Sequence, residues 1–200
     1  MISLRVIDFA SSAAKTWKDV NPAWPDRPIK VYSPGTDSGT FDYFKEVVAG
    51  KEGKIRSDMS VSEDDNTLVT GVAGDENAIG FFGVAYYEEN KDKLHSVAID
   101  AGKGPVSPTA ETIENGSYAP FSRPLFIYVS KAATAKPEVK AFVDFYLTKA
   151  PEIVGDVGYV KLPDSVYEKA MRNFNAQRTG TQFSDEKGNA IAGAVTEVYQ

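Results

Sequence analysis

Two hydroxyl side chains, separated by one glycine, precede an apolar run with helical spacing. The stretch reads Gly35-Thr36-Asp37-Ser38-Gly39-Thr40 and continues into Phe41-Asp42-Tyr43-Phe44. A β-like run over residues 29–32 leads into it. The amides in the first turn of a helix have no acceptor within the helix, and the helix dipole adds partial positive charge there. This order of strand, loop and helix predicts an oxyanion site, with inorganic phosphate as the expected ligand.

Every residue from Thr36 to Thr40 is included in the predicted phosphate site. Ser38 and Thr40 offer hydroxyl donors, and Gly39 allows the main chain to come close to a ligand. Thr36 and Asp37 form the loop that leads into them. A second interpretation stays open, in which Ser38 is only the N-cap of the following helix. The two interpretations are compatible, because a cap can bind an anion when the start of its helix is exposed.

The amino-acid composition argues against several classes of function. The chain has 200 residues, is 42% apolar and carries a formal net charge of −6 without a basic stripe, which argues against nucleic-acid binding. No apolar run approaches the roughly 18 residues that a membrane span requires. There is no cysteine and a single histidine, His95, so neither a thiolate nor a multi-histidine metal site is expected. We expect no metal and no cofactor.

Strand-like and helix-like segments alternate along the chain. Strands are predicted over residues 27–32, 78–82, 94–99 and 125–129. Helices are predicted over residues 38–48, 62–74, 109–115, 137–147, 151–157 and 163–177, with a short helix or turn over 86–90 and a loop over 15–26. Residues 125–129 are apolar on both faces, which is typical of a strand covered on both sides. The alternation predicts an α/β fold with a mixed or parallel sheet.

Several long blocks occur in an order typical of one protein family. They are Trp17-Lys18-Asp19-Val20-Asn21-Pro22-Ala23-Trp24-Pro25, the motif of residues 35–44, Ser62-Glu63-Asp64-Asp65-Asn66, Gly80-Phe81-Phe82-Gly83-Val84-Ala85-Tyr86-Tyr87, Ser122-Arg123-Pro124-Leu125 and Gly158-Tyr159-Val160-Lys161-Leu162-Pro163. With these blocks the chain resembles, from about residue 15 onward, the phosphate-binding protein of the high-affinity phosphate ABC transporter.

The resemblance implies a class II periplasmic-binding-protein-like fold with two lobes that close on the ligand. It implies one complete lobe over residues 25–125, with residues 1–24 and 126–200 forming part of the other lobe. Ser38, Gly39 and Thr40 match the family's phosphate donors. The implied partners are phosphate and the permease subunits of the transporter, in a periplasmic or other extracytoplasmic location. The N-terminal residues do not have the pattern of a signal peptide.

Two features depart from the family. Many members carry an arginine four residues before the motif serine, where this chain has Pro34. Members are also longer, and the segment before the matched region builds most of the first lobe and supplies further hydroxyls and a proton-accepting aspartate. Residues 1–14 do not resemble that segment. We therefore expect a truncated or partial form that exposes apolar surface.

Two other function classes remain open from the sequence. A phosphate-ester hydrolase could use the same anion site, with Asp37, Ser38 and His95 as the available nucleophile and base. A fragment with an interaction role and no ligand is the other alternative. The binding protein is favoured, because nothing in the spacing connects those three residues.

Overall fold

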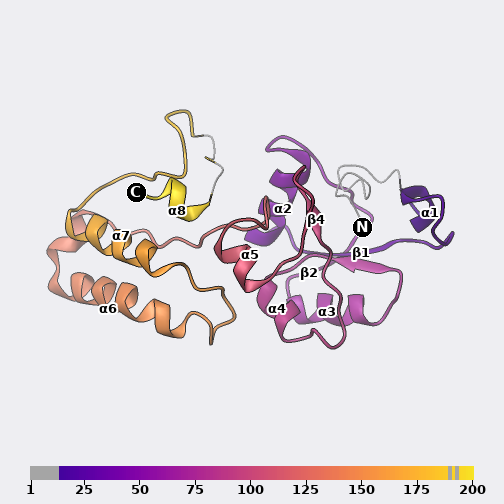
Figure 1. The fold of residues 1–200 in the computed structure, drawn as a ribbon, viewed down its shortest axis with the longest axis horizontal. Helices are drawn as coiled ribbons and strands as arrows, with labels where there is room; N and C mark the ends of the chain where they lie inside the picture. Colours follow the sequence, from indigo (N-terminus) through magenta and orange to yellow (C-terminus); the bar gives the residue numbers. More distant parts are fainter. Residues whose placement is uncertain (1–13, 189–190, 192–193) are drawn as a thin grey trace. The chain divides into compact units, whose positions relative to one another are not determined.

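Three short parallel strands form the centre of the N-terminal part of the chain (Figure 1). The computed structural model describes residues 14–188, 191 and 194–200. Its strands here are β1 (Lys30–Pro34), β2 (Ser60–Ser62) and β3 (Ala78–Gly80), in the order β2-β1-β3. Tyr32 of the central strand pairs with Ser60 on one side and Gly80 on the other. The predicted α/β fold with a parallel sheet is confirmed.

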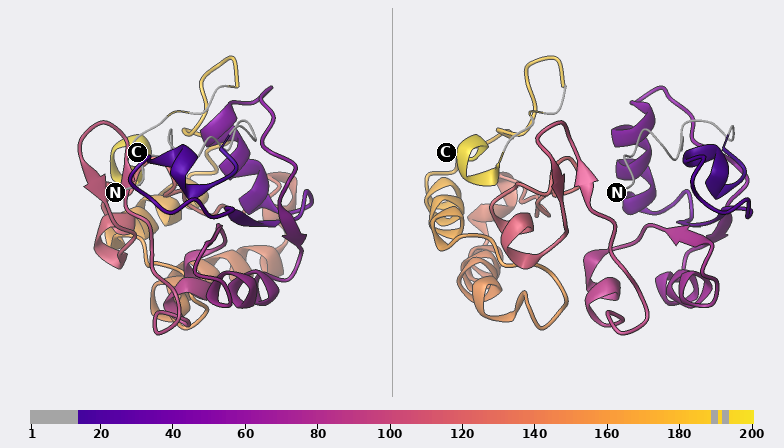
Figure 2. Two further views of the ribbon diagram at one scale, coloured as in Figure 1. Left: turned by 90° about the vertical axis from the view of Figure 1, so that its right-hand side faces the viewer. Right: turned by 45° about the vertical axis from the view of Figure 1, so that its right-hand side comes forward.

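Helices cover both faces of this sheet (Figures 1 and 2). They are α2 (Gly39–Ala49) on one face and α3 (Asp65–Ala73) with α4 (Val84–Glu88) on the other. Each helix follows a strand; the alternating pattern predicted this for α2 and α4, whereas β2 before α3 was not among the predicted strands. The cap of α3 is Asp64, whose carboxylate accepts from Asn66 N at 3.0 Å. The helix predicted from residue 62 starts only at Asp65, because residues 60–62 form β2 and Asp64 is the cap.

The two faces of β1 pack differently, as the two-residue period of a strand requires. Val31 is 2% exposed and belongs to a core cluster with Phe44 of α2. The Phe44 ring stacks on Phe81 with centroids 3.8 Å apart. On the opposite face, the Tyr32 ring lies against Gly71 of α3, where a Cβ atom would collide with it. The alternation along β1 thus fixes one helix on each face.

Two other segments of the N-terminal part differ from the sequence-based expectation. The predicted loop over 15–26 contains α1 (Trp17–Val20), which forms because Thr16 and Asp19 cap each other's main-chain amides. The predicted strand over 94–99 is wrong except at its end. The structure instead has β4 (Ile99–Asp100) antiparallel to β5 (Pro105–Val106), closed by the Asp100 carboxylate, which accepts from two glycine amides.

The described part of the chain divides into two compact units. The residues up to Pro108, with Ala119–Phe121, form the first, and Thr109–Tyr118 with Ser122–Gln200 form the second. The lobe boundaries expected from the sequence, residues 25–125, stay a prediction. Residues 1–13, interpreted above as neither a signal peptide nor the family's preceding segment, lie outside the described residues.

Helices make up the second unit. They are α5 (Ala110–Glu114), the 3-10 helix η1 (Ala132–Ala135), α6 (Pro137–Ile153), α7 (Asp164–Asn175) and α8 (Val195–Val198). α6 packs along α7. The two helices predicted over 137–147 and 151–157 are one continuous helix to Ile153. Pro151 near the end of α6 removes one hydrogen bond without ending the helix.

The strand predicted over residues 125–129 is wrong. This segment pairs with no strand among the described residues and forms neither helix nor turn. Its side chains are largely exposed, and Tyr128 is 90% exposed. The physical reason is that a strand exists only through hydrogen bonds to a neighbour, which an apolar sequence pattern cannot supply.

Candidate functional site: the carboxyl edge of the parallel sheet

The three parallel strands end at the same edge of the sheet, and a helix begins after each of them. β1 leads to α2, β2 to α3 and β3 to α4. β1 has the later strands β2 and β3 on its two sides. In open α/β sheets, ligands bind outside the carboxyl ends of the strands, at the point where the strand order reverses. That point is here the end of β1, from which the motif of residues 35–40 emerges.

The loop after β1 is a tight turn that leads into α2. Ser38 N donates to Gly35 O at 3.0 Å, which closes the turn. Thr36, Asp37 and Gly39 are exposed, and Ser38 and Thr40 are half-buried. The structure therefore brings all five predicted site residues together around the start of one helix, with their groups accessible.

Ser38 is the N-cap of α2. Its Oγ accepts from Thr40 N at 3.2 Å, and its main-chain oxygen accepts from Asp42 N at 3.1 Å. The capping interpretation is thus correct. It does not exclude ligand binding, because a serine hydroxyl that accepts one hydrogen bond still has its proton to donate to an anion.

A carboxylate that the sequence analysis did not assign borders this loop. Glu63 lies directly over Gly35, so closely that a Cβ atom on Gly35 would collide with the Glu63 carboxylate. The strand register explains this placement, since Pro34 and Ser62 are partners and the residues after them are neighbours. Knowledge of that register would have identified Glu63 from the sequence.

The start of α3 adds further negative charge at the same edge of the sheet. Burial, followed by the neighbouring carboxylates of Asp64 and Glu63, raises the pKa of Asp65. The amide-rich start of α2 therefore lies in the same row of strand ends as an acidic group of three residues. Carboxylates repel an anion, so an anion bound at the start of α2 has to be held by directed N–H and O–H donors rather than by the local net charge.

Arg56, which is buried within the described part of the first unit, lies away from this site. Arg56 precedes β2, and its side chain is 1% exposed. Its guanidinium donates to both carboxylate oxygens of Asp58, at 2.7 and 2.8 Å, and Lys15 Nζ lies 3.1 Å from the same carboxylate. Arg56 thus belongs to the edge where the strands begin. Position 34, where the resemblance led us to expect arginine, is occupied by a buried proline.

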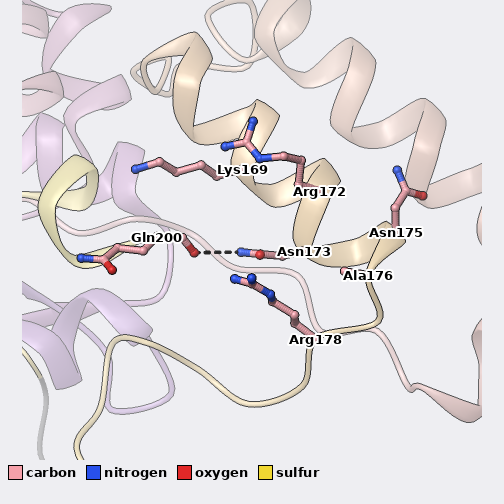
Figure 3. A pocket seen from close by; sticks show the side chains of 7 residues that line it. All are labelled: Lys169, Arg172, Asn173, Asn175, Ala176, Arg178 and Gln200. Carbon is pink, nitrogen blue, oxygen red and sulfur yellow. Dashed lines mark hydrogen bonds between the residues drawn. The ribbon is translucent and has the colours of Figure 1, made fainter.

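A basic hollow of about 630 Å³ lies in the second unit (Figure 3). Its lining includes Lys169, Arg172 and Arg178. Lys169 Nζ donates to Tyr199 O at 2.9 Å, and Asn173 Nδ2 donates to Gln200 O at 3.3 Å. These bonds hold residues 199–200 against α7. None of the predicted site residues lies in this hollow.

His95, the other candidate for catalysis, is exposed in the loop between α4 and β4. No hydrogen bond connects it to Ser38 or Asp37 among the described residues. Within the same described part, there is no cluster of three or more metal-ligating side chains, and no helix has the length and apolar character needed to cross a membrane.

Comparisons with known proteins identify the family. Residues 8–150 match the model of the PBP superfamily domain. Protein SphX of Synechococcus elongatus is 44% identical over 189 residues, which are 94% of this chain and 55% of SphX. The phosphate-binding protein PstS of Staphylococcus haemolyticus is 42% identical over 162 residues, which are 80% of this chain and 50% of that protein.

Solved structures agree with these relatives. A possible phosphate binding protein from Planctomyces limnophilus has a TM-score of 0.76 at 42% identity, covering 88% of this chain and 64% of that one. A Clostridium perfringens protein with bound phosphate has a TM-score of 0.61 at 28% identity, covering 80% and 63%. The chain spans about half the length of the curated relatives it matches.

The resemblance drawn from the sequence blocks is thereby confirmed. The matched domain model, the curated relatives and the solved structures agree on one family, and the parallel α/β sheet is observed in this chain itself. The family model covers well over half of the 200 residues. The chain belongs to the PBP superfamily.

Proposed function

We propose that this chain binds inorganic phosphate for delivery to an ABC transporter, as part of a substrate-binding protein. The observation that carries the proposal is the accessible start of α2 at the carboxyl end of the central strand, capped by Ser38. Relatives at 42% identity are named phosphate-binding proteins, which supports the same ligand for this chain. Ser38, Gly39 and Thr40 are the proposed donors, with Thr36 and Asp37 in the adjoining loop.

In the proposed binding chemistry, the dipoles of several N–H and O–H groups stabilise the negative charge of the bound anion. Main-chain amides and hydroxyls of the α2 start surround one side of a tetrahedral anion, and the helix dipole adds favourable potential. A carboxylate elsewhere in the complete site accepts a hydrogen bond from the protonated oxygen of hydrogen phosphate. Sulfate has no such proton and would face an unpaired carboxylate, so the site prefers phosphate.

Isothermal titration calorimetry tests the proposal. The chain is titrated with inorganic phosphate and with sulfate, first alone and then with the part of Synechococcus SphX that lies outside the matched region. We expect weak binding to the chain alone, because half a site leaves the anion hydrated. With the complementary fragment we expect phosphate binding in the micromolar range or tighter, and none of sulfate. Absence of phosphate binding in both cases would reject the proposal.

The remaining parts of the proposal concern partners and location. We infer an extracytoplasmic protein that docks on permease subunits and catalyses no reaction, in line with relatives named as binding proteins. A phosphatase assay with p-nitrophenyl phosphate checks the last point. Turnover that disappears in a Ser38→Ala variant would favour the hydrolase alternative over simple binding.

A further inference from the structure

The basic hollow of the second unit gathers positive charge in a chain that is acidic as a whole. Its cationic lining residues are Lys169 and Arg172 of α7 and Arg178 of the segment after that helix, and no described Asp or Glu lines it. The whole chain has 28 Asp and Glu against 22 Lys and Arg. The hollow is therefore a local region of positive potential on a protein of opposite net charge.

Ion pairs within the chain leave most of this positive charge uncompensated. Neither Lys169 nor Arg178 forms an ion pair with a described residue, and Arg172 has only Glu168, at 3.9 Å, with both side chains more than half exposed. An exposed pair at that distance contributes little. The dipole of α7 accounts for Arg172 in the last turn, but its effect does not extend back to Lys169.

Specific hydrogen bonds build one wall of the hollow from residues 199–200. Lys169 Nζ donates to Tyr199 O at 2.9 Å. Asn173 Nδ2 and Gln182 Nε2 both donate to Gln200 O, at 3.3 and 2.8 Å. These bonds join the end of the described chain to α7, so the hollow is bordered by main chain that named contacts hold in place.

The guanidinium groups of Arg172 and Arg178 are available to a ligand. Arg178 is exposed, and its side chain has no hydrogen bond or ion pair with a described residue. In Figure 3 the two arginines lie on either side of the hydrogen bond between Asn173 and Gln200. A guanidinium binds a carboxylate or a phosphate group through two parallel N–H donors. The two arginines are therefore suited to a molecule with more than one such group.

The size and polarity of the hollow narrow the class of ligand. Its volume of about 630 Å³ lies within the roughly 300–1,000 Å³ of small-molecule sites. A single tetrahedral ion would leave most of this space to water, and an apolar molecule would leave the cations without counter-charge.

We propose that the hollow binds a small molecule carrying two or more carboxylate or phosphate groups. Arg172 and Arg178 each bind one of these groups, and Lys169 adds favourable potential while it holds Tyr199. The proposal is independent of phosphate binding at the start of α2, because none of residues 36–40 lines the hollow.

Isothermal titration calorimetry on the full chain at low salt tests the proposal. The probes are citrate, for a polycarboxylate ligand, and pyrophosphate, for a polyphosphate ligand. We expect at least one probe to bind with a Kd below about 1 mM. Binding of one probe alone identifies the source of the oxyanion groups, and binding of both supports the shared chemistry. Weaker binding of both probes would overturn the proposal.

Two variants show whether the arginines make the contact. Arg172→Gln and Arg178→Gln should each weaken binding of the probe at least about tenfold, since each removes charged hydrogen bonds to the ligand. Both arginines are largely exposed, so the variants should fold normally, which circular dichroism checks. The matched control is Lys140→Gln, which removes one positive charge from an exposed position of α6 outside the hollow. A smaller loss in either arginine variant, or an equal loss in the control, would overturn the assignment.

Nuclear magnetic resonance on the 15N-labelled chain separates this hollow from the proposed phosphate site. The probe that binds should shift the amide signals of residues 169–182. Shifts confined to residues 36–42 would mean that the probe occupies the start of α2, which would overturn the proposal for the hollow and leave the proposed function standing.

Discussion

Ser38 has two roles that one hydroxyl group can fill. As the N-cap of α2, Ser38 accepts a hydrogen bond from Thr40 N through its hydroxyl oxygen. The hydroxyl proton takes no part in that bond and can be donated to a ligand. The neighbouring residues Asp37 and Gly39 are exposed. At the scale of single residues, the proposed site is therefore a set of small polar groups whose positions the helix start fixes, and its five proposed residues include no basic side chain.

Ser38→Ala and Thr40→Val should each weaken phosphate binding about tenfold or more, since a hydrogen bond to a charged ligand contributes about 1.5–3 kcal/mol. Calorimetry with the complementary fragment present measures the change. Thr109→Ala is the matched control, because Thr109 caps α5 through a hydroxyl–amide bond of the same 3.2 Å length. Ser38→Ala and Thr109→Ala each remove a helix cap and should lose a similar amount of stability, about 1 kcal/mol. Equal phosphate affinity in the wild type and both site variants would contradict the site.

The ion pair between Asp75 and Lys30 makes stability depend on acid pH. A hydrogen bond from Lys30, followed by bonds from the Asn77 main chain and side chain, lowers the pKa of Asp75 from 3.8 to about 2. The pair therefore stabilises the fold fully above pH 3.8, and this contribution is lost as the pH falls toward 2. Asp75→Asn should lower Tm at pH 6, and the difference should shrink steeply below pH 3.8 and vanish below pH 2. A difference that stays constant over pH 2–6 would disprove the assignment.

At the scale of elements, β1 holds the site between two helices. On one face of β1, Val31 shares a core cluster with Phe44 of α2. On the other face, the Tyr32 ring packs against Gly71 of α3. The end of β1 is therefore fixed from both sides before the loop of residues 35–38 begins. The motif's geometry depends on this packing as much as on its own residues.

Substitutions at two glycines distinguish the packing of α3 on β1 from the geometry of the loop after β1. Gly71→Ala places a methyl group into the Tyr32 ring and should destabilise the fold by about 2 kcal/mol, as overpacking does. Gly35→Ala meets only the carboxylate end of Glu63, which can move away, so its cost should stay below about 1 kcal/mol. Urea unfolding followed by circular dichroism measures both. The reverse order of the two effects would show that α3 does not pack on β1 as described.

The connection between α2 and β2 depends on Arg56 and Asp58. Arg56 is buried, and its second terminal nitrogen, Nη1, has no hydrogen-bond partner. Asp58→Asn leaves the guanidinium charge without its counter-charge and should cost about 2 kcal/mol or more of stability. Asp26→Asn is the control, since its pair with Lys18 is exposed on both sides and should contribute under about 0.5 kcal/mol. Equal small effects would mean that water reaches Arg56.

At the scale of the whole molecule, the chain covers about half of its relatives' length and leaves apolar side chains exposed in the second unit. The sequence pI is near 4.9, so charge repulsion between molecules is weakest at about that pH. Exposed apolar area and low net charge together favour association.

Self-association of the chain alone should therefore be strongest near pH 5 and decrease toward pH 7.5. Light scattering at several pH values measures it. Ile127→Asp adds a charge to the exposed apolar segment and should reduce association at pH 5, whereas Val157→Asp should reduce it less. Association that does not vary with pH would contradict this prediction. A larger reduction by Val157→Asp than by Ile127→Asp would show that the associating surface lies outside residues 125–129.

The sequence predicted those features that local chemistry controls. The helix expected over residues 38–48 is observed as α2 (Gly39–Ala49), because a cap residue and apolar spacing are properties of neighbouring residues. The accessible motif at its start was identified for the same reason. The family could also be inferred from the ordered blocks, and the comparisons confirm it.

Other features depend on residues that are distant in the sequence. Glu63 lies over Gly35 only because β1 and β2 are parallel with Pro34 beside Ser62. Residues 125–129 have the composition of a strand, yet the described chain offers no neighbour to pair with them. The sequence thus determined the helix start and its polar groups, through short-range hydrogen bonding. Only the tertiary structure decided strand register and pairing, because those hydrogen bonds join separate segments.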